Sequence, residues 1–261
     1  MLTTTLNPAS HSEMNLPQEI VETLIDQFAG DPDGLRSCSC ISRRWRHRSQ
    51  HHLFSRISIS FSPHHHFKCW PAAWQSQAGD HIHSLRLDYG VGRSQWITQK
   101  NLTEICLTFP NTKSLTLVNP NLDLYGEFSF GPFKNSLRNL TSLSIENAES
   151  VYLEKLFNLI CIFPTLDNLT INRVNARTQW ACDPPAGTSP KFKGTLTVVN
   201  MYQAYCEPSV IRSLTRLPVA FAEVHFKKSC LKCESFAHGM NDLFYACRET
   251  VKKVEIGRAH V

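Results

Sequence analysis

Apolar residues near the start of the chain recur at helical spacing. Between residues 16 and 28 they fall one, three or four positions apart, which aligns them along one side of a helix: Leu16, Ile20, Val21, Leu24, Ile25 and Phe28. Pro17 suits the first turn, because the N–H that proline lacks would have no helical partner there. Gly, Asp and Pro at residues 30–34 then end the pattern. The sequence predicts an amphipathic helix followed by a turn.

Two more short helices are predicted before residue 57. The second starts near Leu35 and would bury Leu35, Cys38 and Ile41, while the third carries Trp45 and ends near Phe54. Three helices in roughly forty residues form a module that is marginal alone. A module this small cannot bury all of its apolar positions, so the remaining apolar face predicts a partner.

Beyond residue 80 the pattern changes to short strands in which apolar and polar residues alternate. Seven apolar-x-apolar triplets follow one another at intervals of 26 to 30 residues: 85–87, 115–117, 143–145, 169–171, 196–198, 224–226 and 254–256. Helix-like stretches lie between several of them, at 102–109, 152–163, 210–217 and 236–247. Stacked strand-helix units of this kind predict an α/β fold, a curved solenoid with a parallel sheet.

The first module resembles the F-box motif over residues 14–57. The resemblance is carried by Leu16-Pro17-x-Glu19-Ile20, Leu24-Ile25, Leu35-x-x-Cys38-x-x-Ile41-Ser42-x-x-Trp45 and Leu53-Phe54. It implies that the module docks on the Skp-type adaptor of an SCF ubiquitin ligase and, through the adaptor, on a cullin. The matching positions expected to contact the adaptor are Leu16, Pro17, Ile20, Ile25, Leu35, Cys38, Ile41 and Trp45, although some of them must hold the three helices together.

The second region, residues 81–254, resembles degenerate leucine-rich repeats. Most of its strands have an apolar residue three positions before the triplet, as in the repeat pattern L-x-x-L-x-L. The position that usually holds Asn or Cys is instead Gly90, Pro120, Ala148, Val174 or Met201. F-box proteins with such repeats use them to hold a target protein. The residues expected on the concave, target-binding face are Arg86, Asp88, Thr116, Ser144, Glu146, Thr170, Asn172, His225 and Lys227.

The chain is therefore expected to have five parts. They are a disordered tail (1–13), the F-box (14–57), a basic His-rich connector (58–80), the repeats (81–254) and a short tail (255–261). Back-translation turns the last seven residues into the start of a common sequencing-library adapter. We expect this tail to be non-native and the solenoid to be truncated at its C-terminus.

Charge is unevenly distributed along the chain. Residues 1–33 carry six acidic residues and no Lys or Arg, whereas residues 34–79 carry seven basic residues and no acidic ones. Basic residues around an aromatic one are typical of nucleic-acid-binding helices, and such a group occurs at Arg43, Arg44, Trp45, Arg46 and Arg48. The helical spacing of Trp45 from Ile41 favours a core position instead, and a pI of about 8.7 lies below the strongly basic range. We expect no nucleic acid as the principal partner.

Candidate metal sites also have simpler interpretations. Cys230, Cys233, His238 and Cys247 begin like a zinc knuckle, but the last spacing is too long. His64–His66 with Cys69 could bind a transition metal, yet the surrounding prolines favour an exposed linker. No phosphate-binding loop, nucleophile elbow or zinc-hydrolase motif occurs, so we expect neither an enzyme nor a cofactor.

The location of the protein follows from what its sequence lacks. Ten cysteines in 261 residues have no small secreted framework and are expected to be free thiols. With no signal peptide and no long apolar run, we expect a cytoplasmic or nuclear protein without a membrane partner. The function expected is that of a non-catalytic receptor subunit that presents an unidentified target protein for ubiquitination. The alternatives are a leucine-rich-repeat scaffold outside any ligase and, third, a nucleic-acid-binding protein.

Overall fold

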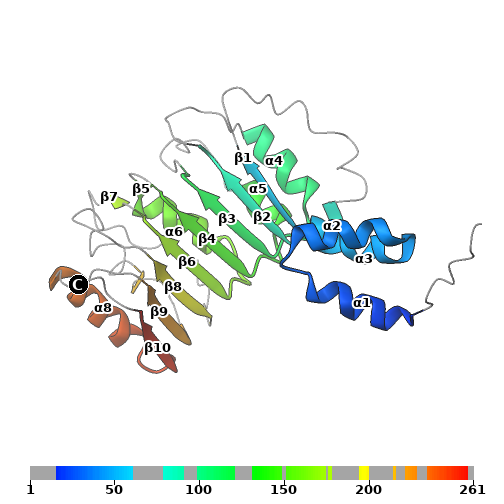
Figure 1. Cartoon of the computed structure of the whole chain (residues 1–261). Coiled ribbons are helices and arrows are strands. Elements are labelled where there is room, and N and C mark those ends of the chain that lie inside the picture. Colours follow the sequence, from blue (N-terminus) through cyan, green and yellow to red (C-terminus); the bar gives the residue numbers. More distant parts are fainter. Residues whose placement is uncertain are drawn as a thin grey trace, which may run out of the picture. The chain divides into compact units, whose positions relative to one another are not determined.

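The computed structural model has two compact units, residues 1–54 and residues 55–261 (Figure 1). Helices make up the first unit, and the second combines a parallel sheet with helices between its strands. This order confirms the α/β class and the three N-terminal helices. The structure describes residues 16–60, 79–90, 99–120, 131–148, 151–174, 176–177, 194–199, 214–215, 221–227 and 234–257.

The first unit consists of α1 (Gln18–Gln27), α2 (Pro32–Ile41) and α3 (Arg43–Phe54). The Asp31 side chain caps α2 by accepting a hydrogen bond from the backbone N–H of Asp33 at 3.1 Å. The core of this unit is small: Val21, Ile25, Leu35 and Cys38 are buried, and Leu16, Trp45 and Leu53 pack against them. A core of this size gives the helical unit only a small free energy of unfolding.

Eight parallel strands in chain order form the sheet of the second unit. They are β1 (Arg56–Ser60), β2 (Ser84–Asp88), β3 (Ser114–Val118), β4 (Ser142–Glu146), β6 (Asn168–Asn172), β8 (Thr195–Val199), β9 (Glu223–Lys227) and β10 (Lys253–Ile256). All seven predicted strands are present. The register pairs equivalent residues of neighbouring units, such as Leu85 with Leu115 and Leu115 with Leu143.

Strand β1 was not predicted. It pairs with β2 over residues 56–60, which we expected to divide between the helical module and a connector. Ile57 and Ile59 extend the two apolar rows of the sheet, because Ile57 pairs with Leu85 and Ile59 with Leu87. A single Ile-x-Ile triplet in a polar stretch is a weak sequence signal, and pairing with β2 is what makes it a strand.

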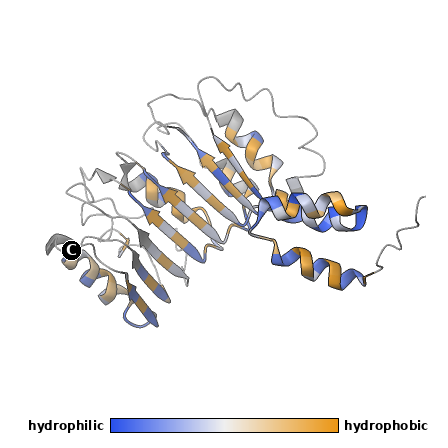
Figure 2. Ribbon diagram, viewed as in Figure 1, coloured by the Kyte–Doolittle hydropathy of each residue, from blue (hydrophilic) through white to orange (hydrophobic). Residues whose placement is uncertain are grey.

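Helices accompany the strands at α4 (Gln99–Thr108), α5 (Gly131–Ser136), α6 (Leu153–Cys161) and α8 (Glu234–Cys247). Three of them match predicted helical stretches, α5 was not predicted, and the stretch at 210–217 lies largely outside the described residues. Apolar strand residues and helix residues form one core that includes Phe109, Phe163 and Phe221. Apolar and polar colours alternate along the strands accordingly (Figure 2). Shorter elements are a 3-10 turn, η3 (Gly79–His81), and a second parallel pair, β5 (Val151–Tyr152) with β7 (Ala176–Arg177).

Left-handed residues follow three of the strands directly. Asn119, Asn147 and Arg173 have φ angles of 51°, 54° and 52°. Asparagine tolerates this conformation better than most side chains do. The next residues, Ala148 and Val174, are fully buried in the core. Apolar packing thus occupies the position where repeats of the resembled family place Asn or Cys.

The C-terminal strand crosses the boundary expected at residue 254. Strand β10 pairs Glu255 with His225 and Ile256 with Phe226, so the first two residues of the expected tail continue the register of the sheet. Within the described part of the chain, no helix is long and apolar enough to cross a membrane.

Candidate functional site

Helix α1, together with its C-cap residue Phe28, carries two parallel rows of apolar residues that differ in exposure. Val21 and Ile25, four positions apart, are buried. Ile20, Leu24 and Phe28, also four positions apart, are 47%, 41% and 39% exposed. We call Ile20, Leu24 and Phe28 the outer row. A continuous exposed apolar row on a short helix is typical of a surface that a partner covers.

Exposed apolar side chains are concentrated in the helical unit. Of the nine large ones in the described residues, five belong to this unit: Ile20, Leu24, Phe28, Ile41 and Phe54. The second unit is far longer, and there the exposed ones are dispersed over α4, α8 and β10. The helical unit is therefore the better candidate for a hydrophobic protein-binding surface.

The residues expected to contact an adaptor divide into two groups. Ile25, Leu35 and Cys38 are buried in the core, where they hold the helices together, so they offer almost no surface to a partner. Leu16 and Trp45 also pack against this core but are only partly buried. Pro17, Ile20 and Ile41 are exposed and remain candidates for direct contact.

Two outer-row residues are missing from the set predicted from the sequence. Leu24 and Phe28 were part of the helical pattern, but nothing in the sequence distinguished them from their buried neighbours Val21 and Ile25. The signal that could have identified them is their spacing of four from Ile20. One exposed member of a row makes the other members candidates as well.

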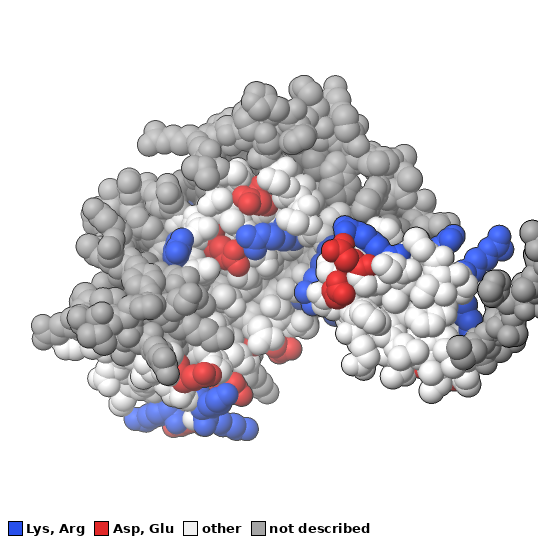
Figure 3. Space-filling view, viewed as in Figure 1, with Lys and Arg blue, Asp and Glu red and all other residues white. Residues whose placement is uncertain are grey.

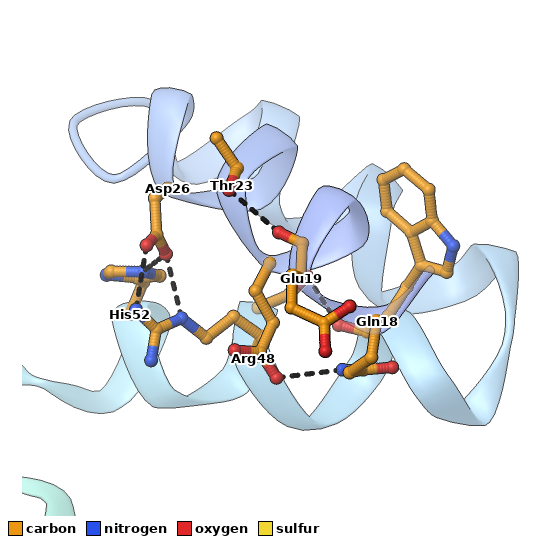
Figure 4. Close-up of polar contacts among 9 residues, drawn as sticks. Gln18, Glu19, Thr23, Asp26, Arg48 and His52 are labelled. Atoms are coloured by element: carbon orange, nitrogen blue, oxygen red, sulfur yellow. Dashed lines mark hydrogen bonds and ion pairs between the residues drawn. The ribbon is translucent and has the colours of Figure 1, made fainter. Parts of the chain in front are cut away.

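A polar seam joins α1 to α3 on another side of α1. It consists of Gln18, Glu22 and Asp26 on α1 and of Arg44, Arg48 and His52 on α3. Arg48 donates to both carboxylate oxygens of Asp26, from Nε and Nη2, at 2.7 Å each, and His52 Nε2 lies 2.6 Å from Oδ1. Figure 4 shows Arg48 and His52 converging on Asp26. At the other end of the seam, Arg44 Nε donates to Gln18 Oε1.

The polar seam lowers the pKa of Asp26. Hydrogen bonds from Arg48 lower the pKa of Asp26 from 3.8 to about 2, with His52 acting in the same direction and partial burial opposing both. The same contact raises the pKa of Arg48. Asp26 therefore stays ionised, and the seam stays formed, over the whole physiological pH range.

Internal contacts occupy most of the arginines of α3. Arg44 and Arg48 contact α1, and Arg46 Nε donates to the Ser39 carbonyl of α2 at 3.3 Å. Trp45 packs against the core of the unit and is not a free stacking surface. These contacts favour a structural role for the basic helix over a phosphate-binding one.

The second surface of interest is the polar face of the sheet. Eight of the nine residues expected there lie on β2, β3, β4, β6 and β9 with described side chains: Arg86, Asp88, Thr116, Ser144, Glu146, Thr170, Asn172 and His225. Lys227 occupies the corresponding position at the end of β9. The register brings them into two rows across the strands.

Charged residues of this face have partners within the sheet and at its edge. Arg86 Nη1 reaches across β3 to Glu146 Oε2 at 3.1 Å. Asp88 Oδ1 accepts from the Gly90 backbone N–H at 3.0 Å and from Asn119 Nδ2 at 3.2 Å. In the space-filling view, charged side chains over the sheet are few and of both signs (Figure 3). A face of short hydroxyl and amide groups with paired charges fits a polar protein segment better than a phosphate backbone.

His225 is the most enclosed of these polar residues. It is 9% exposed, with Nε2 3.0 Å from Glu223 and Nδ1 2.8 Å from Glu255. These contacts place the ring between a carboxylate of its own strand and one of β10.

Among the described residues, no group of three or more His, Cys, Asp or Glu is arranged to hold a metal ion. The expected linker histidines 64–66 with Cys69, and also Cys230 and Cys233, lie outside the part of the chain that the structure describes. In the described part of the chain, Cys38, Cys40, Cys106, Cys161 and Cys247 are not part of a disulfide.

Comparison with known proteins adds no assignment. No known protein family matches the sequence, and no curated protein is significantly similar to it. The outer row of α1 and the polar face of the sheet are therefore the two candidate functional surfaces of the chain.

Proposed function

We propose that the chain is the substrate-recognition subunit of an SCF-type ubiquitin ligase. In this proposal the helical unit binds a Skp-type adaptor, and the strand-helix units, as degenerate leucine-rich repeats, bind the target protein. The observation that carries the proposal is the outer row, Ile20, Leu24 and Phe28, exposed on a unit that also matches the spacing of the F-box motif. The same row would bury its apolar surface on binding.

The role of the chain in such a ligase is to bring two partners together. The adaptor links the receptor to a cullin, and the target is held where a ubiquitin-conjugating enzyme can reach it. The contribution to rate is a high local concentration of target, which needs no catalytic residue in this chain. The paired charges and hydroxyl groups of the sheet face support recognition of a polar protein segment.

Direct binding of a purified Skp-type adaptor to the 261-residue chain tests the proposal. We expect binding by the wild-type chain and its loss in the double variant Ile20→Asp with Leu24→Asp, because two carboxylates would have to be buried at the interface. The control is Leu107→Asp on α4, where the native leucine is 65% exposed in the other unit. No binding by the wild-type chain would leave a repeat scaffold outside any ligase. Equal binding by the double variant would show that the outer row is not the adaptor-binding surface.

A further inference from the structure

The outer row of α1 has more apolar surface than the buried row, because it contains three side chains, one of them a phenylalanine, against two. The amount of apolar surface therefore does not favour the observed setting. Helical geometry of 3.6 residues per turn places the centre of the outer row about 80° around the axis from the pair Val21 and Ile25. A rotation of α1 by that angle would bury Ile20, Leu24 and Phe28 and expose the pair. Core packing and polar contacts must therefore hold α1 in its observed rotational setting.

The polar seam is placed to supply those polar contacts. On the same helical projection, Gln18, Glu22 and Asp26 lie about 80° from the buried pair, on the side opposite the outer row. A rotation that buries the outer row would carry all three away from α3. It would separate Asp26 from Arg48 and His52, which are bonded to it at 2.6 to 2.7 Å.

The contacts at both ends of α1 support this interpretation. Arg44 and Arg48 are four residues apart on α3 and meet Gln18 and Asp26, which are eight apart on α1. Between them, Gln18 Nε2 donates to Glu22 Oε1 at 2.9 Å. The seam thus contacts α1 over two turns, so it resists rotation of the helix as well as its separation from α3.

We propose that the polar seam fixes the rotational setting of α1 and thereby keeps the outer row presented to a partner instead of buried in the core. This inference rests on the proposed function only for the identity of that partner. Asp26 and Arg48 are positioning residues: they act through the orientation of α1. The charged groups of the seam thereby determine which of the two apolar rows of α1 is buried and which is exposed.

Hydroxyl-radical footprinting of the full chain tests the proposal without any adaptor. The test variant is Arg48→Asp, which sets a second carboxylate against Asp26. We expect oxidation of Leu24 to fall by about fivefold as a side chain that is 41% exposed becomes buried. Oxidation of Val21 and Ile25 should rise in the same sample. The milder variant Asp26→Asn should move both sets in the same directions by less.

Two further variants make the result specific. The charge-swapped chain, Asp26→Arg with Arg48→Asp, should restore the wild-type pattern because it rebuilds the pair. Arg36→Asp makes the same change of charge at an exposed ion pair within α2, where Arg36 meets Asp33, and should leave the oxidation rates of Leu24, Val21 and Ile25 unchanged. Unchanged rates in Arg48→Asp would overturn the proposal. So would rates that rise together, because the seam would then only keep the unit folded.

Adaptor binding then separates this inference from the proposed function. With an adaptor that binds the wild-type chain, Arg48→Asp should lower the affinity and the charge swap should recover it. Equal affinity in Arg48→Asp would overturn the positioning role. If the wild-type chain does not bind the adaptor, the proposed function fails, while the footprinting result still decides whether the seam sets the rotation of α1.

Discussion

Alanine substitutions at Leu24 and Ile25, adjacent on α1, should have opposite consequences. Fully burying a leucine side chain stabilises by about 1.5 to 3 kcal/mol. Leu24 is 41% exposed, so a partner that covers it gains that fraction, about 1 kcal/mol. Leu24→Ala should therefore weaken adaptor binding by about fivefold. Its effect on folding should be smaller than that of Ile25→Ala, because part of the leucine side chain is already exposed and alanine favours helix.

Ile25→Ala should act on folding instead. Ile25 is fully buried in a core whose other buried members are Val21, Leu35 and Cys38. Removing its side chain costs about 2 to 5 kcal/mol, which approaches the whole stability of so small a unit. We expect this variant to lose adaptor binding only because the helical unit unfolds.

Two measurements on the full chain distinguish these outcomes. Biolayer interferometry with the purified adaptor gives the change in Kd, and amide hydrogen exchange over residues 18–27 gives the stability of α1. Leu24→Ala should raise the Kd and stay much more protected from exchange than Ile25→Ala, which should exchange fast. The reasoning fails if Leu24→Ala exchanges as fast as Ile25→Ala. It also fails if Ile25→Ala stays protected and weakens binding more than Leu24→Ala does.

Three further predictions concern acid, thiol reactivity and a turn. Because the pKa of Asp26 is lowered to about 2, its stabilisation of the helical unit is complete above about pH 4 and lost as pH falls through about 2. Urea unfolding followed by amide hydrogen exchange in α1 should show that Asp26→Asn lowers the free energy of unfolding by roughly 1 kcal/mol at pH 7. This figure allows for solvent screening, because the Asp26 side chain is 39% exposed. Below pH 2 the variant and the wild-type chain should be equally stable. Burial raises the pKa of Cys106 to about 12. Iodoacetamide at pH 8 should therefore modify the exposed Cys40 in the native chain, while Cys106 should react only after unfolding. Equal modification rates for the two cysteines would contradict the buried position of Cys106. Asn119 has a φ of 51°, and both Asn119→Val and Asn119→Gly lose its hydrogen bond to Asp88. Thermal unfolding should therefore show Asn119→Val less stable than Asn119→Gly by about 1 to 2 kcal/mol, because only valine is strained in the left-handed conformation.

Local sequence patterns were sufficient for most of the elements. The three helices and seven strands follow from residues close together in the chain, because burial on one side imposes a period of 3.6 on a helix and of two on a strand. The polar positions of the sheet follow from the same alternation, so the residues expected on that face, from Arg86 to Lys227, do lie on strands of one sheet. Strand β1 shows where this reasoning stops, because only pairing with β2 distinguishes Ile57 and Ile59 from a polar connector.

Which face of α1 enters the core was decided by the tertiary structure. The sequence alone determined that α1 has more apolar positions than one helix face can bury, and on that ground it predicted a partner for the remaining ones. It did not determine that Ile20 and Leu24 stay outside while Val21 and Ile25 go in, because both rows satisfy the same helical period. That choice depends on contacts between residues more than twenty positions apart, such as Asp26 with Arg48 and His52. Such contacts form only when α1 and α3 pack together, so no local pattern can encode them.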